Sequence, residues 1–262
     1  IALFSMIGMG VFGQGFVGKL AFPSANVSDR LEKTFTSVNF NMMIMVIYAL
    51  ITIAIFGMWY YARYEGNFLP SPKKTFNPMM LVAIVILVPG TQFAANFIAN
   101  LTGYIRPDWM QQYNELFETS GITDTTFVTV LYSVILAPIC EELIFRGVTM
   151  RCARKALPFA LANLMQAALF GLFHLNWIQG IYAFALGIVL GYVCERGGSI
   201  YYSMGLHLLF NLWGTLSGFF PDPGNSVVVF VIVIAVTIVS LVVGFVLFNK
   251  GRRKLPINST GI

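Results

Sequence analysis

The sequence consists of long apolar runs separated by short charged connections. Each run has the roughly 20 residues that a helix needs to cross a bilayer. Only 10% of the 262 residues are charged and 57% are hydrophobic, whereas soluble domains carry about 25% charged residues. We therefore expect an all-α, polytopic membrane protein that forms a single domain over residues 1–262. The eight expected transmembrane helices lie near Ile1–Phe22, Met42–Ala62, Pro78–Leu101, Phe127–Phe145, Leu157–His174, Ile178–Cys194, Ile200–Phe219 and Val227–Phe248.

Basic residues in the connections predict the orientation of these helices. Lys and Arg gather in every second connection, and Arg106 is the one basic residue in the later alternate connections. The positive-inside rule then places both termini in the cytoplasm. The first connection departs from the rule, because Lys19, Arg30 and Lys33 fall on the predicted outside. The net charge of +5 fits segments beside anionic lipid, and we expect no nucleic-acid partner. The basic connections are 63–77, 146–155, 195–198 and the tail after Asn249.

Two segments need a separate interpretation. The chain begins at Ile1 inside an apolar run, without a Met or a basic leader, so we expect the natural N-terminus to be missing. The connection Thr102–Thr126 is too short for a domain and is expected to hold an interfacial helix. Its aromatic residues Trp109, Tyr113 and Phe117 are predicted to lie at the lipid headgroups.

Ionisable side chains inside the predicted spans fall in three places. Charge is costly in a bilayer, so such residues are candidates for function. Glu142 and Arg146 are four residues apart, share a helix face and can pair, which leaves Glu141 without a local partner. Two adjacent carboxylates resist joint ionisation, and one of them is then suited to act as a general acid or base. The three sets are Glu141-Glu142 with Arg146, then His174, then His207 with Asn211.

Spacing from the turns predicts that these sets meet. Glu141 lies 17 residues before Pro158 and His174 lies 16 residues after it. In an antiparallel helical hairpin both return to one depth, roughly 25 Å from the turn. His207 and Asn211 lie nine and 13 residues past the next basic turn and share one face. We therefore expect the four residues to converge inside the membrane, toward the cytoplasmic side.

This set of side chains favours the activation of water. No Ser or Cys nucleophile lies beside a histidine, so acyl-enzyme chemistry is poorly supported. Glu141 with His174 can activate a water molecule, and His207 with Asn211 can donate hydrogen bonds to the oxyanion of a tetrahedral intermediate. The predicted reaction is peptide hydrolysis. Zinc bound by the two histidines and a Glu is an alternative, although the usual His-Glu-x-x-His spacing is absent; we expect no cofactor.

The ordered motifs resemble a known family. Glu141-Glu142-x-x-x-Arg146, Phe170-x-x-x-His174 and His207-x-x-x-Asn211 are similar to the signature of the CAAX protease and bacteriocin-processing family. Its members are glutamate-type intramembrane endopeptidases and include the type II CAAX prenyl endopeptidase. The resemblance covers about residues 130–216, within an expected catalytic core near residues 127–219.

The resemblance implies a role for each matching residue. It makes Glu141 the general base and His174 a ligand of the water, and it assigns His207 and Asn211 to the oxyanion hole. Glu142 and Arg146 would support the site. It also implies an eight-helix fold, a cavity open laterally or to the cytoplasm, and catalysis without a metal.

Other functions remain open at this point. The preferred interpretation is an endopeptidase, most simply of a bacterial cytoplasmic membrane, that cleaves a membrane-associated peptide or protein near the cytoplasmic leaflet. Whether that substrate is prenylated is not determined. The alternative is a non-proteolytic scaffold or bacteriocin immunity protein that binds a membrane protein partner. Ion or proton transport would need a polar path to the outer face. Aromatic residues near the motifs can accept a lipid tail or only pack; they are Phe145, Phe170, Phe173, Phe210 and Trp213.

Overall fold

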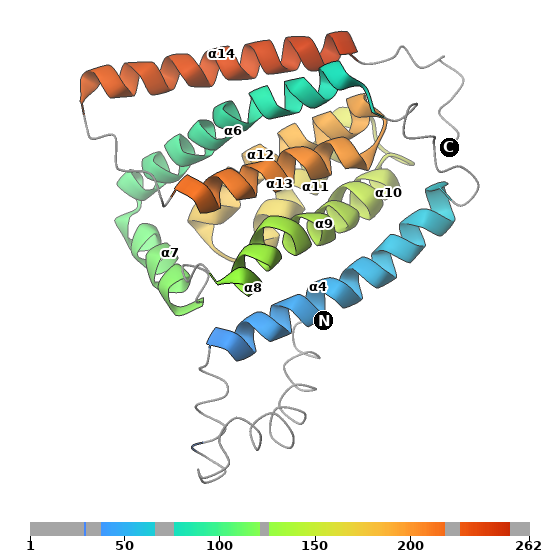
Figure 1. The fold of residues 1–262 in the computed structure, drawn as a ribbon, viewed down its shortest axis with the longest axis horizontal. Helices are drawn as coiled ribbons and strands as arrows, with labels where there is room; N and C mark the ends of the chain where they lie inside the picture. Colours follow the sequence, from blue (N-terminus) through green and yellow to red (C-terminus); the bar gives the residue numbers. More distant parts are fainter. Residues whose placement is uncertain (1–28, 30–37, 66–75, 121–125, 218–225, 252–262) are drawn as a thin grey trace.

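Helices make up the regular structure of the described chain. The computed structural model describes residues 29, 38–65, 76–120, 126–217 and 226–251, and within these ranges it contains no strand (Figure 1). The expected all-α fold is therefore confirmed. The expected first span, Ile1–Phe22, lies outside the described residues.

The helices follow the predicted apolar runs closely. One predicted run forms a composite helix, Phe127–Ala153, which joins five short segments. These segments are α8 (Phe127–Val130), η3 (Leu131–Leu136), α9 (Ala137–Glu142), η4 (Leu143–Met150) and α10 (Arg151–Ala153). The other elements are α4 (Val38–Tyr60) with η2 (Tyr61–Glu65), α6 (Pro78–Ile105), α7 (Pro107–Ser120), α11 (Phe159–Phe173), α12 (Trp177–Gly197), α13 (Ile200–Ser217) and α14 (Val227–Gly251).

Five helices of the described chain are long and apolar enough to cross a bilayer, so this is an integral membrane protein. Two other predicted spans differ. Helix α11 has 15 residues, about 22 Å, against a hydrocarbon core of about 30 Å. Helix α13 carries the polar residues of the third motif, which lower its hydropathy. The expected number of eight spans therefore stays a prediction. The five spans are Met42–Arg63, Pro78–Ile105, Phe127–Ala153, Trp177–Gly197 and Val227–Gly251.

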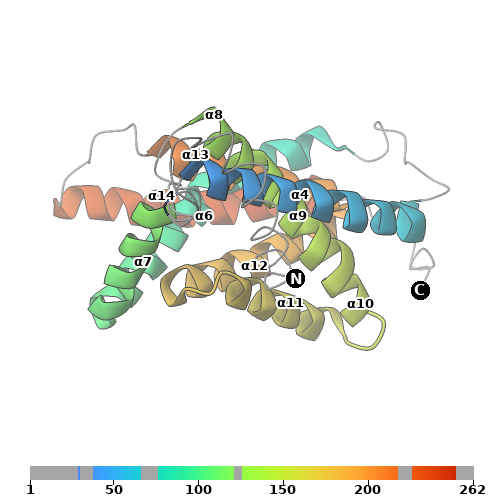
Figure 2. The same cartoon turned by 90° about the horizontal axis from the view of Figure 1, so that it is seen from below.

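Helices α4 and α14 lie on opposite outer sides of the bundle (Figure 1). Helix α14 packs along α6, and α4 packs against α9 and η4 of the composite helix. The outer faces of both helices are apolar and exposed; Ile55 and Val239, for example, are 55% and 59% exposed. Such faces suit contact with lipid. Helices α11 and α12 pack against each other and form a second layer (Figure 2).

The bundle has two different ends. Helix α7 lies at one end, which we call the α7 end, and α10 lies at the other in both views (Figures 1 and 2). We call the second the basic end, because most described Lys and Arg residues lie there. Hydrogen bonds between helix termini hold the basic end together: Arg151 Nη2 to Tyr60 Oη at 3.0 Å, Arg154 Nε to Glu195 Oε1 at 3.2 Å, and Asn77 Nδ2 to the Gly251 carbonyl at 2.9 Å.

The helix expected in the connection Thr102–Thr126 is present as α7 (Pro107–Ser120). It follows α6 directly and contacts α12, where Trp109 stacks on Trp177 with ring centroids 5.3 Å apart. Tyr113 points to the bundle, because it lines the large cavity described below. The side chain of Phe117 lies outside the described residues.

Candidate active site

The composite helix is irregular where it carries the two glutamates. Pro138 cannot donate a backbone hydrogen bond and disturbs the turn before it. The Ala137 N–H accordingly bonds to the Tyr132 carbonyl, five residues back. A second widened segment, η4, follows Glu142 directly. Widened turns of this kind are frequent at functional sites, and here they flank the single α-helical segment that presents both carboxylates.

Glu142 forms the predicted ion pair with Arg146. Arg146 Nη1 donates to Glu142 Oε1 at 2.7 Å, and both side chains are 0% exposed. The guanidinium also donates from Nη2 to the Gly187 carbonyl at 3.3 Å and lies 4.5 Å from the centre of the Phe170 ring. A fully buried charge needs such compensation. The pair therefore acts as a fixed support behind the site, not as a group that faces the cavity.

His207 lies between the two glutamates. Its Nδ1 is 3.0 Å from Glu142 Oε1, and its Nε2 is 3.6 Å from Glu141 Oε2. The carboxylate of Glu142 can only accept a hydrogen bond, so Nδ1 carries a proton and donates it. Nε2 therefore faces Glu141. Glu141 is the more accessible carboxylate, with 15% of its side chain exposed.

His174 and Asn211 are held by backbone carbonyls. His174 caps α11, and its Nδ1 donates to the Phe170 carbonyl at 2.8 Å. In a neutral imidazole this leaves Nε2 free to accept a hydrogen bond from water. Asn211 Nδ2 donates to the Ser133 carbonyl at 2.8 Å. An amide nitrogen carries two hydrogens, so Asn211 keeps a second one for another acceptor.

One cavity of about 840 Å³ collects these groups. Glu141, His174, His207 and Asn211 all line it, whereas Glu142 and Arg146 lie buried behind them. The structure thus brings together four side chains from the composite helix, α11 and α13. Their catalytic roles stay predictions, but their arrangement has the parts that hydrolysis requires: a carboxylate, a free imidazole nitrogen and hydrogen-bond donors around one space.

The sequence analysis did not predict several other polar residues that line this cavity. Gln92 and Asn96 of α6 line the same cavity, and Gln92 is 7% exposed with its Nε2 3.3 Å from Asn96 Oδ1. Tyr182 of α12 lines it as well. The available signal was a pair of carboxamides four residues apart, on one face of an otherwise apolar run.

The five aromatic residues near the motifs divide between the cavity wall and helix packing. Phe170, Phe173 and Phe210 line the cavity. Phe145 packs behind the first of these with ring centroids 5.1 Å apart, and Trp213 turns toward Phe93 of α6 at 6.1 Å. Neither of them faces the cavity, because aromatic residues at helical spacing also fill helix contacts.

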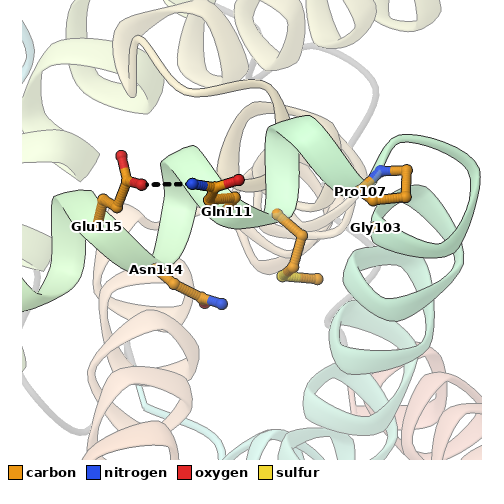
Figure 3. A pocket seen from close by; sticks show the side chains of 6 residues that line it. Gly103, Pro107, Gln111, Asn114 and Glu115 are labelled. Atoms are coloured by element: carbon orange, nitrogen blue, oxygen red, sulfur yellow. Dashed lines mark hydrogen bonds between the residues drawn. The ribbon is translucent and has the colours of Figure 1, made fainter.

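A second hollow lies away from these groups. It has a volume of about 460 Å³ and lies at the junction of α6 and α7 (Figure 3). Its ionisable residue Glu115 accepts a hydrogen bond from Gln111 Nε2 at 2.8 Å (Figure 3). It contains none of the predicted site residues, so the candidate chemistry lies in the larger cavity. The lining residues are Gly103, Pro107, Met110, Gln111, Asn114 and Glu115.

A zinc site would need a set of ligands around one point. Within the described ranges, no three His, Cys, Asp or Glu side chains are arranged to hold a metal ion. His207 Nδ1 is already used by Glu142, and His174 Nδ1 by a carbonyl. The zinc alternative therefore has no preformed ligand set in this part of the chain.

Comparison with known families identifies the segment that carries the site. Residues 123–213 match the family described as type II CAAX prenyl endopeptidase Rce1-like. This confirms the resemblance drawn from the three motifs, all of which lie inside the matched segment. Comparisons with curated proteins and with solved structures gave no match.

Proposed function

We propose that this protein, a member of the CAAX prenyl endopeptidase family through residues 123–213, is a glutamate-type intramembrane endopeptidase. The observation that carries the proposal is the convergence of Glu141, His174, His207 and Asn211 on one cavity inside a membrane-spanning bundle. Its substrate is a peptide or protein associated with the membrane, prenylated or not, and the reaction needs no metal.

Glu141 acts as the general base in this mechanism. A water molecule donates one hydrogen bond to Glu141 and a second to His174 Nε2. Glu141 takes a proton from the water while the oxygen attacks the carbonyl carbon of the scissile bond. When the tetrahedral intermediate collapses, the C–N bond breaks and Glu141 gives its proton to the leaving amine. The carboxylate is then restored and water has been added across the bond.

His207 and Asn211 stabilise the oxyanion. Asn211 offers its second amide hydrogen, because the first is held by Ser133. His207 can offer Nε2–H only as an imidazolium, because Nδ1–H is donated to Glu142. The Glu142 carboxylate stabilises that imidazolium and orients the ring, and Arg146 in turn fixes Glu142. The buried pair thus supports the site through His207.

The first prediction tests the base directly. We expect Glu141→Gln to lower the cleavage rate by roughly 10²–10⁴-fold, because the carboxamide cannot accept the proton of water. The assay uses the full chain in detergent with a farnesylated peptide that ends in a Cys-a-a-X sequence, and release of the C-terminal tripeptide is measured. Glu115→Gln is the matched control, since it makes the same change in α7 outside the cavity.

The outcome decides between an enzyme and a scaffold. Wild type and Glu115→Gln should both release the tripeptide, and Glu141→Gln should not. The assay is repeated with the same peptide lacking the farnesyl group. If wild-type protein that shows a normal thermal unfolding transition releases no more tripeptide than Glu141→Gln from either peptide, the protease proposal is wrong. A non-proteolytic scaffold that binds a membrane partner would then explain the fold.

A further inference from the structure

We propose that Gln92 of α6 binds the main chain of the substrate beside the scissile bond. Its carboxamide oxygen accepts a hydrogen bond from a peptide N–H, so the site recognises an extended backbone in addition to any side chain or lipid. The inference rests on the proposed function, because it names how the substrate of that site is held. Gln92 lies outside the segment 123–213 that matches the family.

The carboxamide of Gln92 is buried, and its hydrogen-bonding capacity is only partly used. The residue is 7% exposed, and its Nε2 donates to Asn96 Oδ1 at 3.3 Å. Its Oε1 is buried and has no hydrogen-bond partner among the described residues. An amide nitrogen carries two hydrogens, and a carboxamide oxygen can accept two bonds. Gln92 therefore keeps an acceptor and one donor for another group.

This free acceptor faces the cavity that the four candidate site residues line. Two other polar side chains of the lining already have partners. Thr129 Oγ1 lies 2.8 Å from Thr126 Oγ1, and Thr215 Oγ1 donates to the Asn211 carbonyl at 2.9 Å. Buried polar groups are normally paired. The unpaired oxygen of Gln92 therefore indicates a ligand that donates a hydrogen bond inside the cavity.

The packing of α6 against α13 places Gln92 near the reacting atoms. A Cβ added at Gly214 would lie 3.9 Å from Gln92 Nε2, so the carboxamide lies against this turn of α13. Asn211 precedes Gly214 by three residues, on the same face and about 4.5 Å away along the helix axis. Gly214 has no side chain to fill the space beside Gln92. The carboxamides of Gln92 and Asn211 thus lie about one helical turn apart along α13.

This separation fits a peptide in an extended conformation. In the proposed mechanism Asn211 holds the oxygen of the scissile carbonyl. An extended chain rises about 3.3 Å per residue, so a group one helical turn away meets the backbone one or two residues from the scissile bond. The N–H and C=O of one extended residue can both bond to the same neighbour. The free acceptor and the free donor of Gln92 match these two groups.

A partner for the backbone is needed because of the surroundings of the site. A segment bound for cleavage is extended at the scissile bond, so its peptide groups lack the internal pairing of a helix. Unpaired peptide groups are costly away from water. Gln92 can pair them whatever the side chains of the substrate are. We therefore expect the site to accept different sequences but to reject a residue without an N–H, such as proline, at one position.

Backbone N-methylation tests this contact at a single atom of the substrate. The peptides that end in Cys-a-a-X, with and without the farnesyl group, carry a dye and one N-methyl group. The methyl group is placed in turn on the Cys, the residue before it, the second a and X. Binding to the full Glu141→Gln chain in detergent is measured by fluorescence anisotropy, so cleavage does not interfere. The series is repeated with Gln92→Leu added to this chain.

We expect Gln92→Leu to weaken binding of the unmodified peptide by roughly 5–50-fold, because a peptide N–H is left unpaired. At one position, N-methylation should weaken binding to the parent chain by a similar factor. The same methyl group should have little effect once Gln92 is Leu, because both changes remove one and the same hydrogen bond. Asn100→Leu is the matched control, since it removes a carboxamide from α6 outside the cavity lining.

Equal binding by the parent and Gln92→Leu would overturn the inference, and so would N-methyl effects that are the same in both chains at every position. The thermal unfolding transition shows that each variant is folded. The N-methyl series on the parent chain alters only the peptide, so an effect at none of the four positions would also contradict the contact.

Cleavage by chains with an intact Glu141 distinguishes this inference from the proposed function. Gln92→Leu should raise KM with little change in kcat, since the backbone is held equally in the bound substrate and the transition state. A wild-type chain that binds the peptides through Gln92 but releases no tripeptide would contradict the protease proposal alone. Cleavage that is indifferent to Gln92→Leu would contradict the inference alone, and a chain that neither binds nor cleaves would contradict both.

Discussion

Glu141 and Glu142 are neighbours in the chain but have different surroundings. Glu142 is fully buried and accepts hydrogen bonds from Arg146 and His207. Glu141 lies on the cavity wall and is partly exposed. One carboxylate is therefore paired with a cation, and the other is accessible from the cavity. A helix rotates about 100° per residue, so adjacent positions can meet a packed core and a polar cavity.

Removing one member of the buried pair should destabilise the protein strongly. We expect Arg146→Met to lower the free energy of unfolding by about 3–5 kcal/mol, because Glu142 would remain as an uncompensated buried charge. The double variant Glu142→Leu with Arg146→Met should regain most of that loss, since both charges are gone. Thermal unfolding in detergent measures both. A double variant as unstable as the single one would contradict this account.

The same double variant should remain inactive although it is stable. His207 would lose the carboxylate that accepts its Nδ1–H. The double variant should therefore unfold near the wild-type temperature but cleave no peptide. This result would show that the pair positions His207 and does not only stabilise the fold.

Asn211 gives a test of the oxyanion hole. We expect Asn211→Leu to lower kcat by about 10²–10³-fold with little change in KM, the loss typical of removing one oxyanion donor. The variant also loses the bond to the Ser133 carbonyl, at about 1 kcal/mol of stability. Thr215→Val is the matched control, because it removes the bond from Thr215 Oγ1 to the Asn211 carbonyl but no donor to the oxyanion. Equal losses of kcat in both variants would argue against the assignment.

At the level of elements, the contact between α11 and α12 holds the site from behind. Gly187 and Gly191 of α12 let the two helices approach closely. The Gly187 carbonyl accepts hydrogen bonds from Arg146 and from Gln166 Nε2, the latter at 2.8 Å. Asn163 Nδ2 donates to the Ile188 carbonyl at 3.0 Å. Small residues in membrane helices permit this approach and allow polar side chains to bond across the contact.

A methyl group at Gly191 should disrupt this contact. A Cβ there would collide with the Asn163 amide oxygen and lie 2.7 Å from Gln166 Nε2. We expect Gly191→Ala to lower the unfolding free energy by about 1–3 kcal/mol, as overpacking does. Gly205→Ala is the control, because a Cβ at that position of α13 meets nothing within 4 Å. It should leave the thermal transition unchanged or raise it slightly, owing to higher helix propensity.

If Gly191→Ala unfolds at the same temperature as wild type, α11 and α12 do not pack as closely as described. A Gly205→Ala variant that is equally destabilised would show a general intolerance to added volume, and the contact would then not be the cause.

At the scale of the whole molecule, contact with lipid should determine where the outer helices tolerate a charged side chain. Val239 lies at the centre of α14 and is 59% exposed, whereas Val227 at its start is 78% exposed. We expect Val239→Arg to disfavour membrane insertion by about 2.5–3.5 kcal/mol, the cost of Arg at a helix centre. Val227→Arg should cost much less, because its side chain can reach the headgroups. The fraction of protein that resists alkaline extraction from membranes measures both.

Equal integration of both variants would show that the centre of α14 does not face lipid. The bundle would then need a covering partner along that face, in place of the bilayer.

Some parts of the structure could be predicted from the sequence and others could not. The runs Met42–Ala62, Pro78–Leu101 and Val227–Phe248 became α4, α6 and α14, because apolar length alone determines such helices. The apolar run Leu157–His174 predicts a full span, whereas α11 has only 15 residues and the chain bends at Leu175, a feature that hydropathy does not show. Gln92 and Asn96 were missed as cavity residues, since a carboxamide in an apolar run carries no motif.

The sequence by itself determined the membrane environment and the helical fold, and it named four candidate site residues that line one cavity. Bilayer-length apolar runs permit only helices whose backbone groups are paired internally, and costly ionisable residues within those runs mark the site. The tertiary structure decided what depends on how the helices pack: which glutamate is buried and which faces the cavity, and which side chains of α6 complete the cavity wall. Spacing along a helix gives depth from a turn, but the side chains that border a cavity depend on which gaps the neighbouring helices leave.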